Sequence, residues 1–133
     1  MARKKIEFTA THGRDKDKKF LLTEMSAADT EDWAAQAFFL LMGAGIEIPD
    51  DDAQAGIAGL IKMGISALGK VPYEQARPLL ERMMECVQVR PDPRHPDVLR
   101  ALMDDDIEEV KTRFQLRKAI WDLHTGFSQA AGQ

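Results

Sequence analysis

The sequence contains a single cysteine, Cys86, among its 133 residues. One cysteine cannot form a disulfide within the chain or build a cysteine-rich metal site. Long apolar runs are also missing, because the longest, Ala37 to Ile46, has ten residues including two glycines, whereas a membrane-spanning helix needs about 20 apolar residues. No apolar stretch follows the basic residues near the N-terminus, so no secretory signal is expected. We therefore expect a soluble, cytoplasmic protein that does not bind a membrane.

Sequence signatures of catalysis and of cofactor binding are missing too. The chain has no phosphate-binding glycine loop, no nucleophile elbow and no dinucleotide fingerprint. Its three histidines, His12, His95 and His124, have no spacing typical of a metal site. The aspartate runs at 50–52 and 104–106 fall at expected helix starts, where the helix dipole favours acidic side chains. We expect no catalytic residue, no metal ligand and no cofactor, and hence a protein that is not an enzyme.

Basic side chains are absent from residues 20–61, which carry eight acids. Residues 1–19 hold seven basic and three acidic residues, a net charge of +4. Acids interleave with these basic residues and Phe8 is the single aromatic there, which argues against nucleic-acid binding. Lysines that protect the edge of a β-hairpin are the favoured interpretation. The acidic block would suit a basic protein partner.

The pattern of apolar residues indicates which elements to expect. Alternation at residues 4–9 predicts a strand. Residues 19–24 can return as the second strand of a β-hairpin with a long loop, and the consecutive Phe20, Leu21 and Leu22 leave its register open. Ser26 is a suitable N-cap for a helix that runs to about Met42. Further helices are expected at 53–68, at 73–87 with a kink or break at Pro78, and from the aspartates at 104–106 onward, while 98–103 is either a strand or a helical turn.

These elements predict a mainly α (α+β) fold. We expect a single domain of four to five helices with an N-terminal β-hairpin. The expected division is a basic hairpin at 1–25, a helical core at 26–127 and a polar tail at 128–133.

Two helices carry more apolar surface than a small domain easily buries. The segment Phe38 to Met42 is apolar on every face, which is typical of a helix that is either deeply buried or covered by a partner. The last helix has two neighbouring apolar stripes, wide enough to contact more than one element. The candidate partner-binding residues are Phe38, Phe39, Leu41, Met42, Trp121 and Phe127.

Three stretches together resemble a known family. They are Phe20-Leu21-Leu22-Thr23-Glu24-Met25-Ser26-Ala27 with Trp33-Ala34-Ala35-Gln36-Ala37-Phe38, then Leu79-Leu80-Glu81-Arg82-Met83-Met84-Glu85-Cys86-Val87, and then Arg117-Lys118-Ala119-Ile120-Trp121-Asp122-Leu123-His124-Thr125-Gly126-Phe127. Their order and spacing resemble the small tail assembly chaperones of long-tailed bacteriophages and prophages. The resemblance covers about residues 20–127 and contains no catalytic signature.

The resemblance implies a non-enzymatic protein with two partners. Such a chaperone binds the tape measure protein, keeps it soluble during tail assembly and helps recruit tail-tube subunits. It acts in the cytoplasm of the bacterial host and is not expected in the mature virion. Another phage structural or adaptor protein, such as a head–tail connector component, is the alternative, and self-association stays open.

Overall fold

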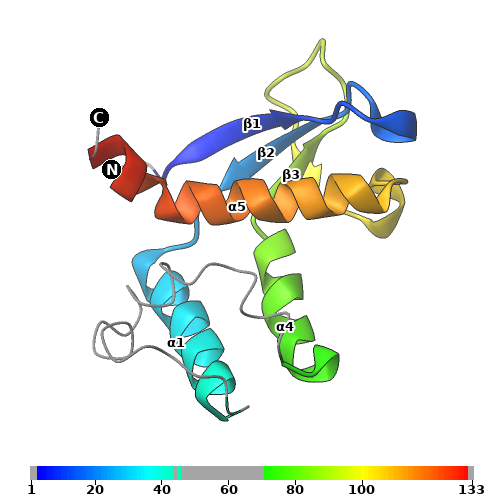
Figure 1. Cartoon of the computed structure of the whole chain (residues 1–133). Helices are drawn as coiled ribbons and strands as arrows, with labels where there is room; N and C mark the ends of the chain where they lie inside the picture. The colour runs from blue at the N-terminus through cyan, green and yellow to red at the C-terminus, as the bar shows by residue number, and fades with distance from the viewer. Residues whose placement is uncertain (1–2, 44, 46–70, 132–133) are drawn as a thin grey trace. The chain divides into compact units, whose positions relative to one another are not determined.

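The structure is a computed structural model that describes residues 3–43, 45 and 71–131, with side chains described as far as Thr125. The chain divides into two units (Figure 1). The first combines Met1–Glu24 with Arg82–Gln133, and the second is Met25–Glu81.

The first unit contains a four-stranded antiparallel sheet with the order β1-β2-β3-β4. Strands β1 (Lys5–Thr9) and β2 (Lys19–Thr23) form the predicted hairpin, so this prediction is confirmed. Strand β3 (Val87–Arg90) pairs with β2, and β4 (Arg100–Ala101) pairs with β3. The hairpin is therefore completed by strands from the other end of the chain.

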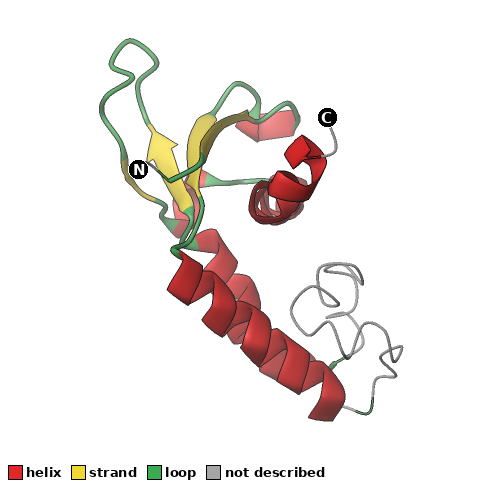
Figure 2. Cartoon of the chain, turned by 90° about the vertical axis from the view of Figure 1, so that its left-hand side faces the viewer, coloured by secondary structure: helices red, strands yellow, loops and turns green. Residues whose placement is uncertain are grey.

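Helix α5 (Val110–Ala131) covers one face of this sheet. In Figure 2 the same helix is seen almost along its axis, beside the strands. Side chains alternate along β2, where Phe20 and Leu22 are fully buried, as expected for a strand with one face against a core. The core of the first unit also includes buried Ala10, Met83, Val87, Val89, Ile107, Leu116, Ile120 and Leu123.

The second unit contains helix α1 (Ala27–Gly43) and most of helix α4 (Tyr73–Met84), whose last turn belongs to the first unit. The predicted N-cap of α1 is confirmed, because the Ser26 hydroxyl oxygen accepts the N–H of Asp29 at 3.0 Å. Such a cap satisfies one of the free N–H groups at a helix start. The buried face of α1 consists of Trp33, Ala34, Ala37 and Leu41.

The prediction of a mainly helical domain with four to five helices is wrong. The described residues form three α-helices and a four-stranded antiparallel sheet, an α+β arrangement. The helix expected at 53–68 lies outside the described residues. The third predicted helix is also shorter than expected, because it ends at Met84 and strand β3 begins at Val87. Pro78 neither breaks nor splits α4, which is assigned as one helix.

The expected start of the last helix at the aspartates is also wrong. Residues Asp104–Asp106 form a separate 3-10 turn, and α5 begins at Val110. The Asp106 carboxylate accepts the N–H of Met103 at 2.7 Å and pairs with Arg100 at 2.6 Å. These bonds hold the Asp106 side chain on the residues before it, and the 3-10 turn ends at Asp106 instead of continuing into α5.

Gly13 occupies a position where a side chain is expected to be costly. Its φ is +55°, and an added Cβ would lie 3.0 Å from the Cδ of Glu109. We expect Gly13→Ala to lower the free energy of unfolding by about 1–2 kcal/mol, through left-handed backbone strain and displacement of Glu109. Urea unfolding measures it. The matched control is Gly43→Ala, where an added Cβ meets nothing within 4 Å and a helical alanine should be neutral or stabilising.

Candidate functional site

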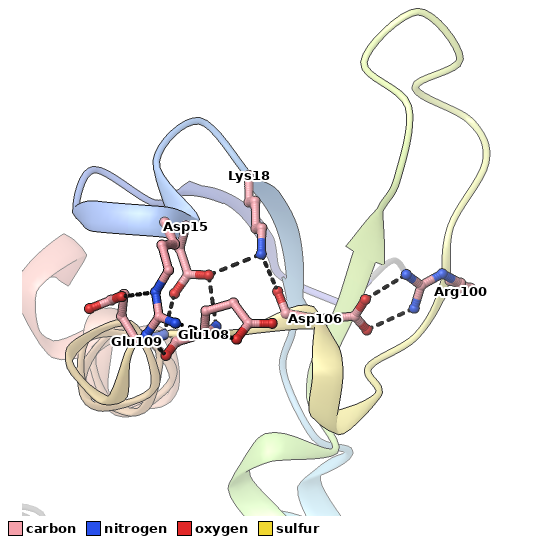
Figure 3. Close-up of polar contacts among 7 residues, drawn as sticks. Asp15, Lys18, Arg100, Asp106, Glu108 and Glu109 are labelled. Carbon is pink, nitrogen blue, oxygen red and sulfur yellow. Dashed lines mark hydrogen bonds and ion pairs between the residues drawn. The ribbon is translucent and has the colours of Figure 1, made fainter.

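The most extensive polar cluster of the first unit centres on the buried Asp15 (Figure 3). Its carboxylate accepts the N–H groups of Glu108 and Glu109, each at 2.8 Å, and the ammonium of Lys18 at 3.0 Å. Glu108 and Glu109 immediately precede α5, so a hairpin-loop side chain serves the exposed N–H groups at this helix start. Arg14 adds a 2.6 Å bond to the Glu109 carboxylate.

The hydrogen bonds that Asp15 accepts lower its pKa more than burial raises it. Burial alone would raise the pKa of this carboxyl, but the N–H of Glu108, together with Lys18 and the N–H of Glu109, lowers the pKa well below its usual range. Asp15 is therefore ionised at neutral pH, and its carboxylate accepts hydrogen bonds from other residues of the fold. The cluster explains how the hairpin loop holds the start of α5.

Neither an activated cysteine nor a cluster of metal-ligating side chains is present among the residues that the structure describes. Cys86 is buried, and burial raises the pKa of its thiol, which disfavours the reactive thiolate. Among the residues described, no group of three or more His, Cys, Asp or Glu side chains could hold a metal ion. No helix in the described ranges is both long and apolar enough to cross a membrane.

Helix α1 instead carries an unusual apolar surface. Phe39 is 68% exposed and Met42 is 52% exposed, and the two positions lie three residues apart, on the same side of a helix. The ring of Phe38 packs edge-on against Phe39, with centroids 5.9 Å apart and planes at 76°. These side chains leave an apolar patch on this side of α1.

A groove of about 520 Å³ lies between α1 and α4 in the second unit, and Phe39 forms part of its lining. Its apolar lining comes from Ala35, Phe39 and Leu40 of α1 and from Pro78 and Leu79 of α4. The polar side chains that complete it are Asp32, Gln36 and Gln75. An apolar groove with a few polar groups is the usual form of a protein-binding cleft.

The two walls of this groove are tied together by Trp33. Its indole N–H donates to the backbone carbonyl of Leu79 at 2.9 Å, a buried hydrogen bond between α1 and α4. Trp33 is itself only 6% exposed. Since a buried aromatic and a buried hydrogen bond act at the same point, they define the spacing of the two helices.

The structure places the six predicted partner-binding residues differently. Phe39 and Met42 are exposed on α1 and Phe38 is half-buried, whereas Leu41 is fully buried and not accessible to a partner. Trp121 is half-buried on α5, in the first unit. The side chain of Phe127 lies outside those that the structure describes.

Sequence reasoning missed the contribution of α4 and the polar side of the groove. Ala35, Phe39 and Met42 follow the spacing i, i+4, i+7, which is typical of one helix face, and this signal could have found the exposed side of α1. The α4 residues could not be assigned, because nothing in the sequence pairs α4 with α1.

Helix α5 also exposes apolar side chains. Val110 is 65% exposed and Phe114 is 63% exposed. Basic Lys111 and Lys118 lie on the same helix and are also exposed. Neither Val110 nor Phe114 lines the α1–α4 groove, so Phe114 is a reference aromatic with nearly the same exposure as Phe39.

Comparisons of this chain with known protein families, with curated proteins and with solved structures found no match.

Proposed function

We propose that this chain is a non-enzymatic tail assembly chaperone of a long-tailed bacteriophage or prophage. In this role it binds the tape measure protein in the cytoplasm of the bacterial host, keeps it soluble and helps recruit tail-tube subunits, and it is not part of the mature virion. The resemblance of three stretches between residues 20 and 127 supports the family. The exposed apolar side of α1 supports a binding role.

The observation that carries this proposal is the exposure of Phe39, which lines the α1–α4 groove, together with that of Met42 on the same side of α1. A chaperone for a long helical partner has to cover apolar helix faces until they are buried elsewhere. Grooves between two helices accept the apolar face of a third helix. The acidic side chains Asp29, Glu31 and Asp32 are the ionisable groups of α1, and they favour solubility of the resulting complex.

Co-expression with the long tape measure protein of the same genome tests the proposal. We expect that protein to be insoluble alone, and to become soluble and co-purify when this chain is present. Phe39→Ala should reduce the soluble, co-purified fraction at least about fivefold, since a central aromatic of an interface contributes about 2 kcal/mol or more. Because Phe39 is mostly exposed, this change should leave folding intact.

Phe114→Ala is the matched control, as it removes an aromatic ring of nearly equal exposure from α5. It should leave the soluble fraction within about twofold of the unsubstituted chain, the scale of a surface substitution away from an interface. If the partner stays insoluble and nothing co-purifies, the chaperone proposal fails and the head–tail connector alternative takes its place.

A further inference from the structure

We propose that the α1–α4 groove binds one amphipathic helix that carries a lysine or arginine beside its apolar stripe. The inference deepens the proposed function and rests on it for the source of that helix, a segment of the tape measure protein. It adds the site, the kind of segment and the sign of its charge.

The groove's apolar surface suits helix side chains that recur every three to four residues. Ala35, Phe39 and Leu40 supply one wall, and Pro78 and Leu79 supply the other. Ala35 is the smallest of them, so it leaves space next to the exposed Phe39 ring. The groove has a volume of about 520 Å³.

The groove is preformed. The Trp33 indole bond to the Leu79 carbonyl and the buried face of α1 keep the two walls at a set distance without a ligand. Binding therefore orders few protein groups, and less of the interaction free energy is lost to conformational entropy.

The negative charge of the groove favours a ligand helix that carries a basic side chain beside its apolar stripe. Among the lining residues that the structure describes, Asp32 is the one ionisable side chain, and α1 has no basic residue along its length. The Gln36 amide donates to Oδ2 of Asp32 at 2.7 Å, which fixes the carboxylate at the rim and uses one of its oxygens. A cation on the ligand complements this carboxylate, whereas an acid at the same place is repelled.

Fluorescence anisotropy with the full chain tests the inference. The probe is a labelled synthetic helix-forming peptide of about 16 residues, with leucines at i, i+3, i+4 and i+7 and lysines flanking that stripe. A second peptide has glutamate in place of each lysine. The chain variants are Phe39→Ala and Asp32→Lys, and their matched controls are Phe114→Ala and Glu31→Lys.

We expect the lysine peptide to bind at least about tenfold more tightly than the glutamate peptide. Phe39→Ala should weaken the lysine peptide about tenfold or more, and Phe114→Ala less than about twofold. Asp32→Lys should reverse the preference between the two peptides, whereas Glu31→Lys, a neighbouring charge outside the groove lining, should shift it less.

Equal weakening by Phe39→Ala and Phe114→Ala would overturn the inference, as would two peptides that bind equally or not at all. These failures are distinguishable from failure of the proposed function. If the chain keeps the tape measure protein soluble, and Phe39→Ala and Asp32→Lys are as active as their controls, the proposed function stands and the groove proposal is wrong. If the chain binds the lysine peptide as expected but does not solubilise the tape measure protein, the groove proposal stands and the proposed function is wrong.

Discussion

Replacing Asp15 with alanine should lower the free energy of unfolding by about 3–5 kcal/mol, the range for removing one partner of a buried charged network. Asp15 is fully buried and accepts bonds from two backbone N–H groups and from Lys18. Alanine leaves the N–H groups of Glu108 and Glu109 without this acceptor. It also leaves the half-buried ammonium of Lys18 with the Asp106 carbonyl but without the Asp15 carboxylate.

Thermal and urea unfolding of the full chain measure this loss. A decrease of this size should lower the melting temperature by more than about 10 °C in a protein of this length. Asp97→Ala, which removes an exposed carboxylate of the first unit, is the control and should cost less than about 0.5 kcal/mol. A similar melting temperature for both variants would show that Asp15 does not hold α5.

The Asp15 carboxylate should also make the free energy of unfolding depend on pH in the acidic range. Because the pKa of Asp15 is lowered in the folded chain, its contribution is complete above the unfolded pKa, about 3.9, and is lost as pH falls further. Asp15→Asn cannot titrate here. The stability difference between the unsubstituted chain and Asp15→Asn should therefore be constant above about pH 5 and shrink below about pH 4. A difference that grows on acidification would contradict this assignment.

Replacing Trp33 with alanine should be the most disruptive single change in the second unit. Trp33 is buried and joins α1 to α4 through the 2.9 Å bond to the Leu79 carbonyl. Removing a buried aromatic side chain costs about 3–5 kcal/mol. Trp33→Phe keeps most of the ring volume but leaves the carbonyl without its donor, so it should cost about 1–3 kcal/mol.

Urea unfolding, followed by circular dichroism, separates the two terms. The difference between Trp33→Ala and Trp33→Phe reports the packing, and the difference between Trp33→Phe and the unsubstituted chain includes the hydrogen bond and the remaining loss of volume. Trp33→Phe should also weaken binding of the lysine peptide described above, because α1 and α4 lose the hydrogen bond that joins the two walls of the groove. A peptide affinity unchanged in Trp33→Phe would mean that other contacts set the helix spacing.

Local signals in the sequence were sufficient for the hairpin and for α1. Alternating residues gave β1, since period-two patterning reports a half-buried strand directly. The expectation of a returning hairpin strand gave β2, and both strands match the structure to within one residue at each end. Ser26 marked the start of α1 because its hydroxyl caps a local N–H. Both features depend on residues close together in the chain.

Features set by distant residues were missed. Val87-Gln88-Val89-Arg90 alternates as a strand does, but the apolar residues before it also follow helical spacing, and only pairing with β2 decides between the two. The cap of α5 was missed for the same reason. The aspartates at 104–106 were expected to start the last helix, although the acceptor for the N–H groups of Glu108 and Glu109 is Asp15 of the hairpin loop.

The candidate surface was predicted in part. An all-round apolar segment indicated that α1 has more apolar surface than it can bury, and the structure leaves Phe39 and Met42 exposed. The sequence could not say that Leu41 belongs to the buried face, because the orientation of a uniformly apolar helix is decided by what packs against it. Asp32 and the α4 residues of the groove likewise depend on tertiary pairing.

The order of the chain within the first unit has a consequence for its synthesis. The ribosome produces the β1–β2 hairpin first, but Val87, Val89, Leu116 and Ile120, which share its core, are among the later residues made. During translation the contiguous second unit is synthesised while Phe20 and Leu22 still lack the core residues of β3 and α5, and non-local pairing of this kind is slow. A nascent chain halted before α5 would therefore display the apolar face of its own hairpin, and such truncated products should be prone to aggregation or proteolysis.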